Sequence, residues 1–358
     1  MTARVAIRFV LAVSAALGAC EHSAPFRPEA YGPTGPFGAG SPLRLTFNPG
    51  QDLDPAWLPN GSGIVYTGER RDRADHDRCL AFMPAGGGAI ARYVCRTSAA
   101  DDTLNVFEDA AVSANDSVVY VRVSTERFLQ GIGPDAQQLV VAAAADPNDA
   151  RVLQSVPFTA PWGTTYDALS HIAWLGPSRI AAVGERVTYP RACRTCAPDT
   201  VRTGIGIVIV DFATAVPVLT RLADGDSASS LAAAVNGDTL YFTRDGDSRV
   251  YRHALTSGVT DTLYDFGFGI ARDVSVANGK LAAVVGGAVS YVVDSVLGGS
   301  QPDRGGPLYL LVAGSAPTQI GDPAWLFRRP ALSPDGAHLV VAAWNVSATA
   351  DLWLFQLP

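Results

Sequence analysis

The chain has 358 residues, of which 48% are hydrophobic and 17% are charged, and its formal net charge is −7 at pH 7. Such an acidic chain lacks the basic surface that nucleic-acid phosphates require of a partner. The same charge disfavours adhesion to anionic lipid, so we expect the membrane to be contacted only through a lipid anchor.

Residues 1–19 are predicted to be a signal peptide. Arg4 and Arg8 provide a positive start, and the apolar run Phe9–Ala16 is too short for a bilayer, which takes about 20 residues. The run ends in Leu17-Gly18-Ala19-Cys20, which resembles the lipobox of bacterial lipoproteins. The resemblance implies an exported protein whose Cys20 is lipidated and becomes the new N-terminus. An ordinary secretory signal with an unrelated cysteine is the alternative.

Residues 20–42 are predicted to be the lipidated cysteine followed by a flexible tether. Residues 21–42 contain five prolines and four glycines, too little apolar surface to offset the entropy of ordering. Glu21 follows the cysteine, where aspartate in enterobacterial lipoproteins implies retention at the inner membrane. This resemblance favours the outer membrane, with the domain facing the periplasm or the cell surface.

The four remaining cysteines suggest two disulfides in an oxidising compartment. A hairpin centred on Gly87, in the turn Pro84–Gly88, places Cys79 opposite Cys95. Facing residues of antiparallel strands have Cα atoms about 4.5–5.5 Å apart, which suits a disulfide. Cys193 and Cys196 form a single C-x-x-C without the nearby ligands of a zinc site or the strand–helix setting of a redox motif, so a local disulfide is predicted there too.

One pattern recurs in residues 43–358: a short strand, a polar turn often made of Asn-Gly or Asp-Gly, and an apolar strand. Its six copies are Pro55–Tyr66, Ala111–Tyr120, Ile172–Ala182, Ala232–Phe242, Val274–Ala283 and Ala331–Val341. A second pair of strands can be traced after each copy, for example Arg249–Ala254 with Thr260–Tyr264, and Leu308–Val312 with Thr318–Gly321. Four strands per unit and six units predict an all-β protein, a six-bladed β-propeller.

The count and closure of the ring rest on two further segments. A seventh, degenerate unit within 286–306 is the alternative to six blades. The chain stops at Pro358, after three strands of the sixth unit, while Leu43–Phe47 stands alone before the first. We therefore expect this N-terminal strand to complete the last blade and remove an exposed edge.

The last copy, Pro330–Ala343 followed by Asp351–Phe355, resembles the repeat of TolB-type propellers, and so does the first, with Leu45-Thr46 and then Asp54–Trp57. The resemblance is specific at these two ends and degenerate in between. It implies a propeller that binds proteins or peptides of the cell envelope. TolB itself has an extra N-terminal domain that this chain lacks, so only this general implication carries over.

Binding is predicted at one face of the propeller, where loops join the second and third strands of each unit. Three or more of these loops exceed the usual length of about 2–6 residues; they run over 68–78, 124–137, 184–204, 244–248, 286–306 and 345–350. Alignment of the repeats places one residue per unit at the channel mouth on that face: Asp54, Asp109, Ser170 or His171, Ser229, Arg272 and Arg329, with Asp273 and Arg328 as neighbours. Such a ring would grip a polar or zwitterionic group; a set of mutually satisfied ion pairs is the alternative.

The sequence carries none of the enzyme signatures that would identify a catalytic site. It contains no G-x-S-x-G, no H-E-x-x-H and no G-x-x-x-x-G-K, so no catalytic residue, cofactor or metal ligand is predicted. The segment Asp72–Asp77 fits a solvated loop better than a metal site. The prediction is a non-enzymatic binding module for an envelope protein or peptide. The alternatives are a lyase-like propeller enzyme acting on polysaccharide and a structural surface protein without a defined ligand.

Overall fold

The computed structural model describes residues 42–47, 50–69, 78–88, 90–95, 103–126, 136–188, 201–286, 305–322, 324–344 and 349–358. All regular elements in these ranges are strands. The described ranges contain no helix with the length and apolar character needed to cross a membrane. The predicted signal peptide, Cys20, nearly all of the tether, Cys193 and Cys196 lie outside the described residues, and so does most of the segment considered for a seventh unit.

Four separate sheets of four antiparallel strands make up most of the described structure. The first combines β1 (Leu43–Arg44) with β24 (Leu326–Leu332), β25 (His338–Trp344) and β26 (Asp351–Gln356). The second consists of β12 (Ala168–Gly176), β13 (Arg179–Thr188), β14 (Val201–Asp211) and β15 (Val218–Arg221). The third consists of β16 (Ala228–Ala233), β17 (Thr239–Arg244), β18 (Arg249–Ala254) and β19 (Val259–Asp265). The fourth consists of β20 (Ile270–Ala277), β21 (Lys280–Gly286), β22 (Leu308–Val312) and β23 (Thr318–Ile320).

A fifth sheet has eight strands and two recognisable halves. One half contains β2 (Asp52–Trp57), β3 (Gly63–Glu69), β4 (Arg78–Pro84) and β5 (Arg92–Val94). The other contains β6 (Thr103–Val112), β7 (Ser117–Glu126), β8 (Ala136–Ala143) and β9 (Asp146–Val156). The halves are joined through one parallel residue pair between β4 and β6, Arg78 with Val106.

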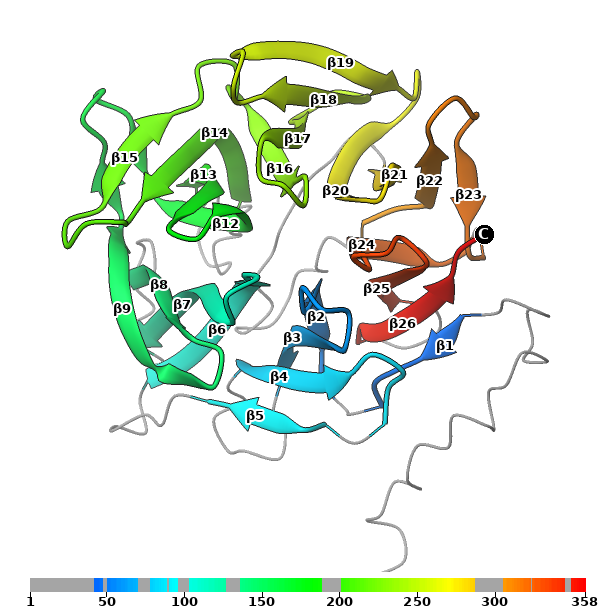
Figure 1. Cartoon of the computed structure of the whole chain (residues 1–358), viewed down its shortest axis with the longest axis horizontal. Coiled ribbons are helices and arrows are strands. Elements are labelled where there is room, and N and C mark those ends of the chain that lie inside the picture. Colours follow the sequence, from blue (N-terminus) through cyan, green and yellow to red (C-terminus); the bar gives the residue numbers. More distant parts are fainter. Residues whose placement is uncertain are drawn as a thin grey trace, which may run out of the picture.

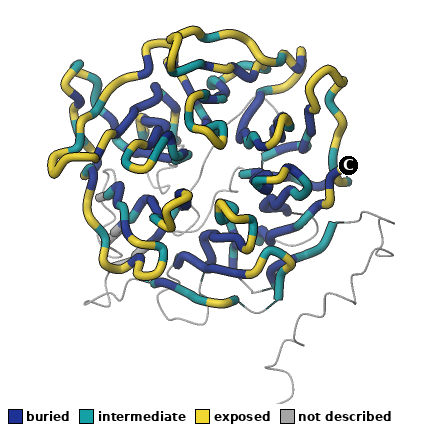
Figure 2. Tube along the Cα trace, in the orientation of Figure 1, coloured by how far each residue is buried: buried dark blue, intermediate teal, exposed yellow. Residues whose placement is uncertain are grey.

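The sheets stand around a common centre like the blades of a propeller, with β2, β6, β12, β16, β20 and β24 innermost (Figure 1). The all-β class and the propeller arrangement predicted from the repeats are confirmed. The strands next to the innermost ones are largely buried, and the outer strands carry most of the exposed residues (Figure 2). Strand β3, for example, is buried at six of its seven positions, whereas β19 is mostly exposed. A strand sandwiched between two sheets needs apolar residues on both faces, which is why the second strand of each repeat reads as a continuous apolar run.

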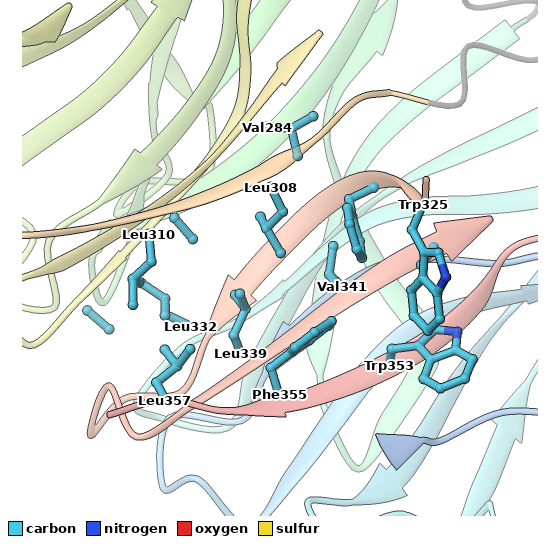
Figure 3. Close-up of a cluster of buried hydrophobic side chains, with 14 residues drawn as sticks. Val284, Leu308, Leu310, Trp325, Leu332, Leu339, Val341, Trp353, Phe355 and Leu357 are labelled. Atoms are coloured by element: carbon cyan, nitrogen blue, oxygen red, sulfur yellow. The ribbon is translucent and has the colours of Figure 1, made fainter. Parts of the chain in front are cut away.

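The core consists of side-chain layers between neighbouring sheets. The layer between β20–β23 and β24–β26 contains Leu308, Phe327, Leu339 and Phe355, and the tilted rings of Trp325 and Trp353 have centroids 4.6 Å apart (Figure 3). Corresponding layers fill the other junctions around the ring. Burial of apolar area of this kind is the main stabilising contribution to the fold.

Two predicted links between distant parts of the chain are confirmed, the pairing of the N-terminal strand with the last sheet and one disulfide. Strand β1 pairs with β26, so that Leu43 lies opposite Leu354 and Arg44 opposite Trp353, and the N-terminal segment completes the sheet that contains the C-terminus. Cys79 and Cys95 form a disulfide with a Cα–Cα distance of 4.6 Å. The pairing of Leu80 with Val94 in the same hairpin gives the register expected for a turn centred on Gly87.

A small hairpin was not anticipated from the sequence. Strands β10 (Phe158–Thr159) and β11 (Thr165–Tyr166) form a separate two-stranded sheet. The hairpin buries Tyr166 completely. A Cβ at Gly184 would lie 2.2 Å from the ring of Tyr166, so only glycine leaves room for this side chain.

Candidate functional site

The six innermost strands share an irregularity that sets the shape of the channel. Each changes register with its neighbour at the same place; the shifts lie between Leu53/Ala56, Glu108/Ala111, Ser170/Ala173, Ala228/Ser230, Ala271/Val274 and Arg328/Ala331. A β-bulge re-aims the side chains of its extra residues and is common beside functional sites. The residues that repeat alignment assigned to the channel lie within these bulges or at their edges.

Four bulge residues adopt the left-handed backbone conformation although none is glycine. Their φ angles are 50° for Asp54, 53° for Asp109, 48° for His171 and 51° for Arg329. This conformation is uncommon outside glycine and costs roughly 1–3 kcal/mol for each residue. Such a conformation persists only where surrounding contacts enforce it. Each of these four side chains takes part in an ion pair with another inner strand.

Arg329 is the centre of an ion-pair cluster contributed by four inner strands. Its guanidinium lies 2.7 Å from Asp109 Oδ1, 3.2 Å from Asp54 Oδ1 and 3.8 Å from Asp273 Oδ1. Its backbone N–H donates to Asp273 Oδ2 at 2.9 Å. We call the set Asp54, Asp109, His171, Asp273, Arg328 and Arg329 the Arg329 cluster.

Asp273 is the most strongly held carboxylate of the cluster. Arg328 Nε lies 3.5 Å from Oδ2, and His171 Nε2 donates to Oδ1 at 3.0 Å. Burial works to raise the pKa of Asp273, but Arg328, the hydrogen bond from His171 and Arg329 together hold that pKa well below its usual value. Asp273 is therefore the fixed negative charge of the cluster.

Asp54 behaves in the opposite way. Burial raises its pKa; Arg329 counteracts this effect, and the nearby Asp109 carboxylate adds to it. For Arg329 itself, burial opposes the charged form, yet Asp109, Asp54 and Asp273 raise the pKa of the guanidinium above its usual value. The guanidinium is thus the shared counter-ion of three carboxylates that repel one another.

Ser170, His171 and Asp273 form a hydrogen-bonded chain in the order of a serine-hydrolase triad. Ser170 Oγ lies 3.0 Å from His171 Nδ1, and its hydroxyl donates to Glu185 Oε1 at 2.6 Å. The single hydrogen of the hydroxyl can go to Glu185 or to His171 Nδ1, and Glu185 lies closer. A base that accepts the serine proton is the requirement for a nucleophile. Here Glu185 competes with His171 for that proton, and Ser170 is buried.

The Arg329 cluster separates two cavities in the channel. The larger, which we call the chamber, has a volume of about 350 Å³ and extends toward the turns between the first and second strands, where Pro59, Ala114 and Val235 form its rim. The smaller, which we call the small pocket, has a volume of about 90 Å³ and lies toward the opposite ends of the inner strands. His171, Asp273 and Arg329 line both cavities.

All nine residues named for the channel mouth, Ser170 and Ser229 included, line one of these two cavities or both, although the structure does not place them at a single mouth. Asp54 and Asp109 line only the chamber, and Arg272 and Arg328 line only the small pocket. The chamber opens at the face opposite the one predicted from loop lengths. Most of the long loops at that predicted face lie outside the described residues.

Four residues of the small pocket, which come from second and third strands or follow them, were not predicted from the sequence. Glu185 ends an apolar run in β13, Arg202 and Gly204 begin β14, and Asp245 follows β17; all four line the small pocket. A charged residue at the end of an otherwise apolar strand is the one signal that could have identified Glu185. A Cβ at Gly204 would lie 1.8 Å from the carbonyl oxygen of Ala228, so glycine permits β14 to approach β16.

Within the part of the chain that the structure describes, no group of three or more His, Cys, Asp or Glu side chains is placed to hold a metal ion. The segment Asp72–Asp77 lies outside that part.

Loss of the central guanidinium should destabilise the fold. We expect Arg329→Gln to cost about 3 kcal/mol of unfolding free energy, because three buried carboxylates lose their shared counter-ion. The matched control is Arg252→Gln, which removes an exposed pair with Asp261 and should cost under about 1 kcal/mol. Urea denaturation measures both values. Equal costs for the two variants would contradict a central role for Arg329.

The stability contributed by Asp273 should depend on pH in the acid range. Because its folded pKa lies well below 3.8, the contribution is fully present above about pH 4 and is lost as pH falls through the folded pKa. Asp273→Asn should therefore be destabilising at pH 7, with a penalty that shrinks below pH 4. Asp54 has a raised pKa, so Asp54→Asn should cost less at pH 7 than Asp273→Asn. Urea midpoints between pH 3 and 7 test this order, and a larger cost for Asp54→Asn would refute it.

Comparison with known proteins places the chain by fold. A scan against models of protein families finds no match, and a search of curated protein sequences finds none. A protein assigned as TolB from Agrobacterium tumefaciens is 13% identical, with a TM-score of 0.51 over 88% of this chain and 93% of its own. A gluconolactonase from Xanthomonas campestris is 14% identical, with a TM-score of 0.51 over 90% of each chain. At such identities the likeness shows a β-propeller, shared by TolB-like proteins and by enzymes.

Proposed function

We propose that this protein is a lipid-anchored, non-enzymatic component of the cell envelope whose propeller binds a segment of a protein or peptide partner. The observation that supports this function is the chamber. Its volume of about 350 Å³ lies within the range of ligand-binding cavities, which combine apolar walls with a few convergent polar groups.

The walls and the floor of the chamber differ in chemistry. The walls are mostly apolar and include Trp57, Ile172 and Trp174. Both tryptophans are fixed by hydrogen bonds across neighbouring sheets, from Trp57 Nε1 to the carbonyl of Ala331 and from Trp174 Nε1 to that of Ala111. A wall held in this way is pre-organised, which lowers the entropy lost on binding.

The floor is formed by the Arg329 cluster and has an excess of negative charge. Three carboxylates of the cluster line the chamber, those of Asp54, Asp109 and Asp273, and the guanidinium of Arg329 lines it with them. An additional cation would relieve the repulsion among these carboxylates. The favoured partner segment therefore presents an amino group or a guanidinium beside apolar side chains.

We infer that the ring has six blades. The four separate sheets are one blade each, and the eight-stranded sheet counts as two because a single residue pair joins its halves. The side-chain layers support this count, since one of them packs β3–β5 against β6–β8 in the manner of the other junctions.

We further propose that Cys20 is lipidated and attaches the protein to a membrane, by preference the outer membrane. The sequence Leu17-Gly18-Ala19-Cys20 supports this assignment. In a bacterial host that processes lipoproteins, the chain should fractionate with membranes, and Cys20→Ser should leave it unprocessed and unlabelled by radioactive palmitate. Palmitate labelling of the Cys20→Ser variant would contradict the assignment.

Peptide selection on the full-length protein tests binding in the chamber. From a phage-displayed peptide library we expect enrichment of sequences with Lys or Arg beside apolar residues. These peptides should bind at least about tenfold more weakly to Ala114→Trp, which fills the chamber at its exposed rim. Binding would be followed by the emission of the wall tryptophans and by calorimetry.

The matched control is Ala316→Trp, which adds the same side chain to an exposed turn outside the chamber. Its affinity for the enriched peptides should equal that of the unchanged protein. A library without enrichment, or equal binding by both tryptophan variants, would contradict the proposed site.

A further inference from the structure

A groove with a volume of about 830 Å³ runs along the junction between the sheets β16–β19 and β20–β23. Its lining extends from the innermost strand of one sheet, β20, to the outermost strand of the other, β19 (Figure 1). We call it the side groove. Its apolar and aromatic walls include Val235, Tyr241, Tyr264, Val276, Leu311 and Ala313.

The side groove exists because a small residue stands where other sheets carry a large one. In three other sheets, the residue directly after the third strand packs into the junction with the preceding sheet; these residues are Phe212, Leu255 and Leu357. The residue directly after β22 is Ala313, which is exposed and lines the side groove. The apolar layer between these two sheets is therefore incomplete at this end, and part of its wall is left uncovered.

The chemistry of the side groove differs from that of the Arg329 cluster. No carboxylate is found among the described residues that line it, and Lys280 is the one charged residue there. Lys280 precedes Leu281, whose side chain belongs to the layer between the two sheets, so the Lys280 side chain points to the opposite face, where it donates to the carbonyl of Pro358. The side groove thus suits uncharged, apolar groups.

The side groove and the chamber form one continuous surface. Five residues line both: Ala234, Val235, Val276, Ala277 and Pro334. Val235, at this junction, is 81% exposed, which makes it the most exposed large apolar side chain of the described residues. A ligand in the chamber can therefore continue over apolar residues into the side groove.

We propose that the side groove binds the apolar continuation of the partner segment whose cationic group enters the chamber. The partner is then an extended chain with a cation at one end and uncharged apolar residues beyond it. Neighbouring strands lie about 4.8 Å apart, so the path from β16 to β19 is roughly 14 Å, which an extended chain covers with about four residues. This inference rests on the proposed function, because the cation is placed in the chamber.

The test uses peptides enriched from the phage-displayed library, each synthesised whole and also shortened to the cationic residue and its one apolar neighbour. Calorimetry measures their affinity for the full-length protein. Ala313→Trp fills the side groove as Phe212 fills another junction, so it should weaken binding of the whole peptides about tenfold or more and leave that of the short ones unchanged. The control Ala316→Trp, in the same connection but outside the groove, should change neither.

A second pair of variants guards against misfolding, because both positions are exposed on β19. Leu263 lines the outer end of the side groove, whereas Val259 lies outside it. Leu263→Lys places a charge where an apolar side chain would bind and should weaken binding of the whole peptides several-fold. Val259→Lys adds the same charge to the same strand and should leave their affinity unchanged.

Three results would overturn the inference. The first is equal affinity of the whole peptides for both members of each pair; if Ala114→Trp still weakens binding, the proposed function survives. The second is weakening of the short peptides by Ala313→Trp. The third is a lower molar mass in solution for Ala313→Trp than for Ala316→Trp, which would identify a second copy of this chain as the occupant. Failure of Ala114→Trp to weaken any peptide is instead the failure of the proposed function.

Discussion

The contacts of one guanidinium connect the first two repeats of the chain to the last two. Arg329 lies on β24, near the C-terminus, and pairs with carboxylates on β2, β6 and β20. No two of these strands share the same half-sheet, so the interaction fixes the inner strands relative to one another at the axis, where apolar packing between sheets does not reach. The division of the channel is made at this interaction, since Arg329, Asp273 and His171 line both cavities.

The two cavities differ because the bulges direct acidic and basic residues to different sides of this cluster. Asp54 and Asp109 come from the first units and line only the chamber, whereas Arg272 and Arg328 come from the last two and line only the small pocket. The channel is therefore polarised along its axis.

Because the chain is built from a repeat, much of the fold and part of the Arg329 cluster could be predicted from the sequence. The propeller and its closure could be predicted from the apolar second strands, from turns such as Asn60-Gly61 and from the lone segment Leu43–Phe47. The disulfide could be predicted from the spacing of Cys79 and Cys95. Asp54, Asp109 and Arg329 were found because they occupy equivalent repeat positions. Glu185, Arg202 and Asp245 were not, since their meeting depends on the register of β13 with β14 and on the close approach allowed by Gly204. The division of the channel into two cavities was not predicted, because loop length does not report how the bulges divide the channel.

The pairing of β1 with β26 has a mechanical consequence. Only Leu43 and Arg44 form ladder pairs there, reinforced by the ion pair of Arg44 with Asp351 at 2.8 Å and by the Leu45 N–H bonded to the carbonyl of Leu352. A load applied to the chain before Leu43 would fall first on these few bonds and would unzip β1 before it strained any other sheet. The closure of the ring thus depends on a strand that is held by few bonds. A pull from the N-terminal side would expose the hydrogen-bonding edge of β26 while the rest of the core stayed intact.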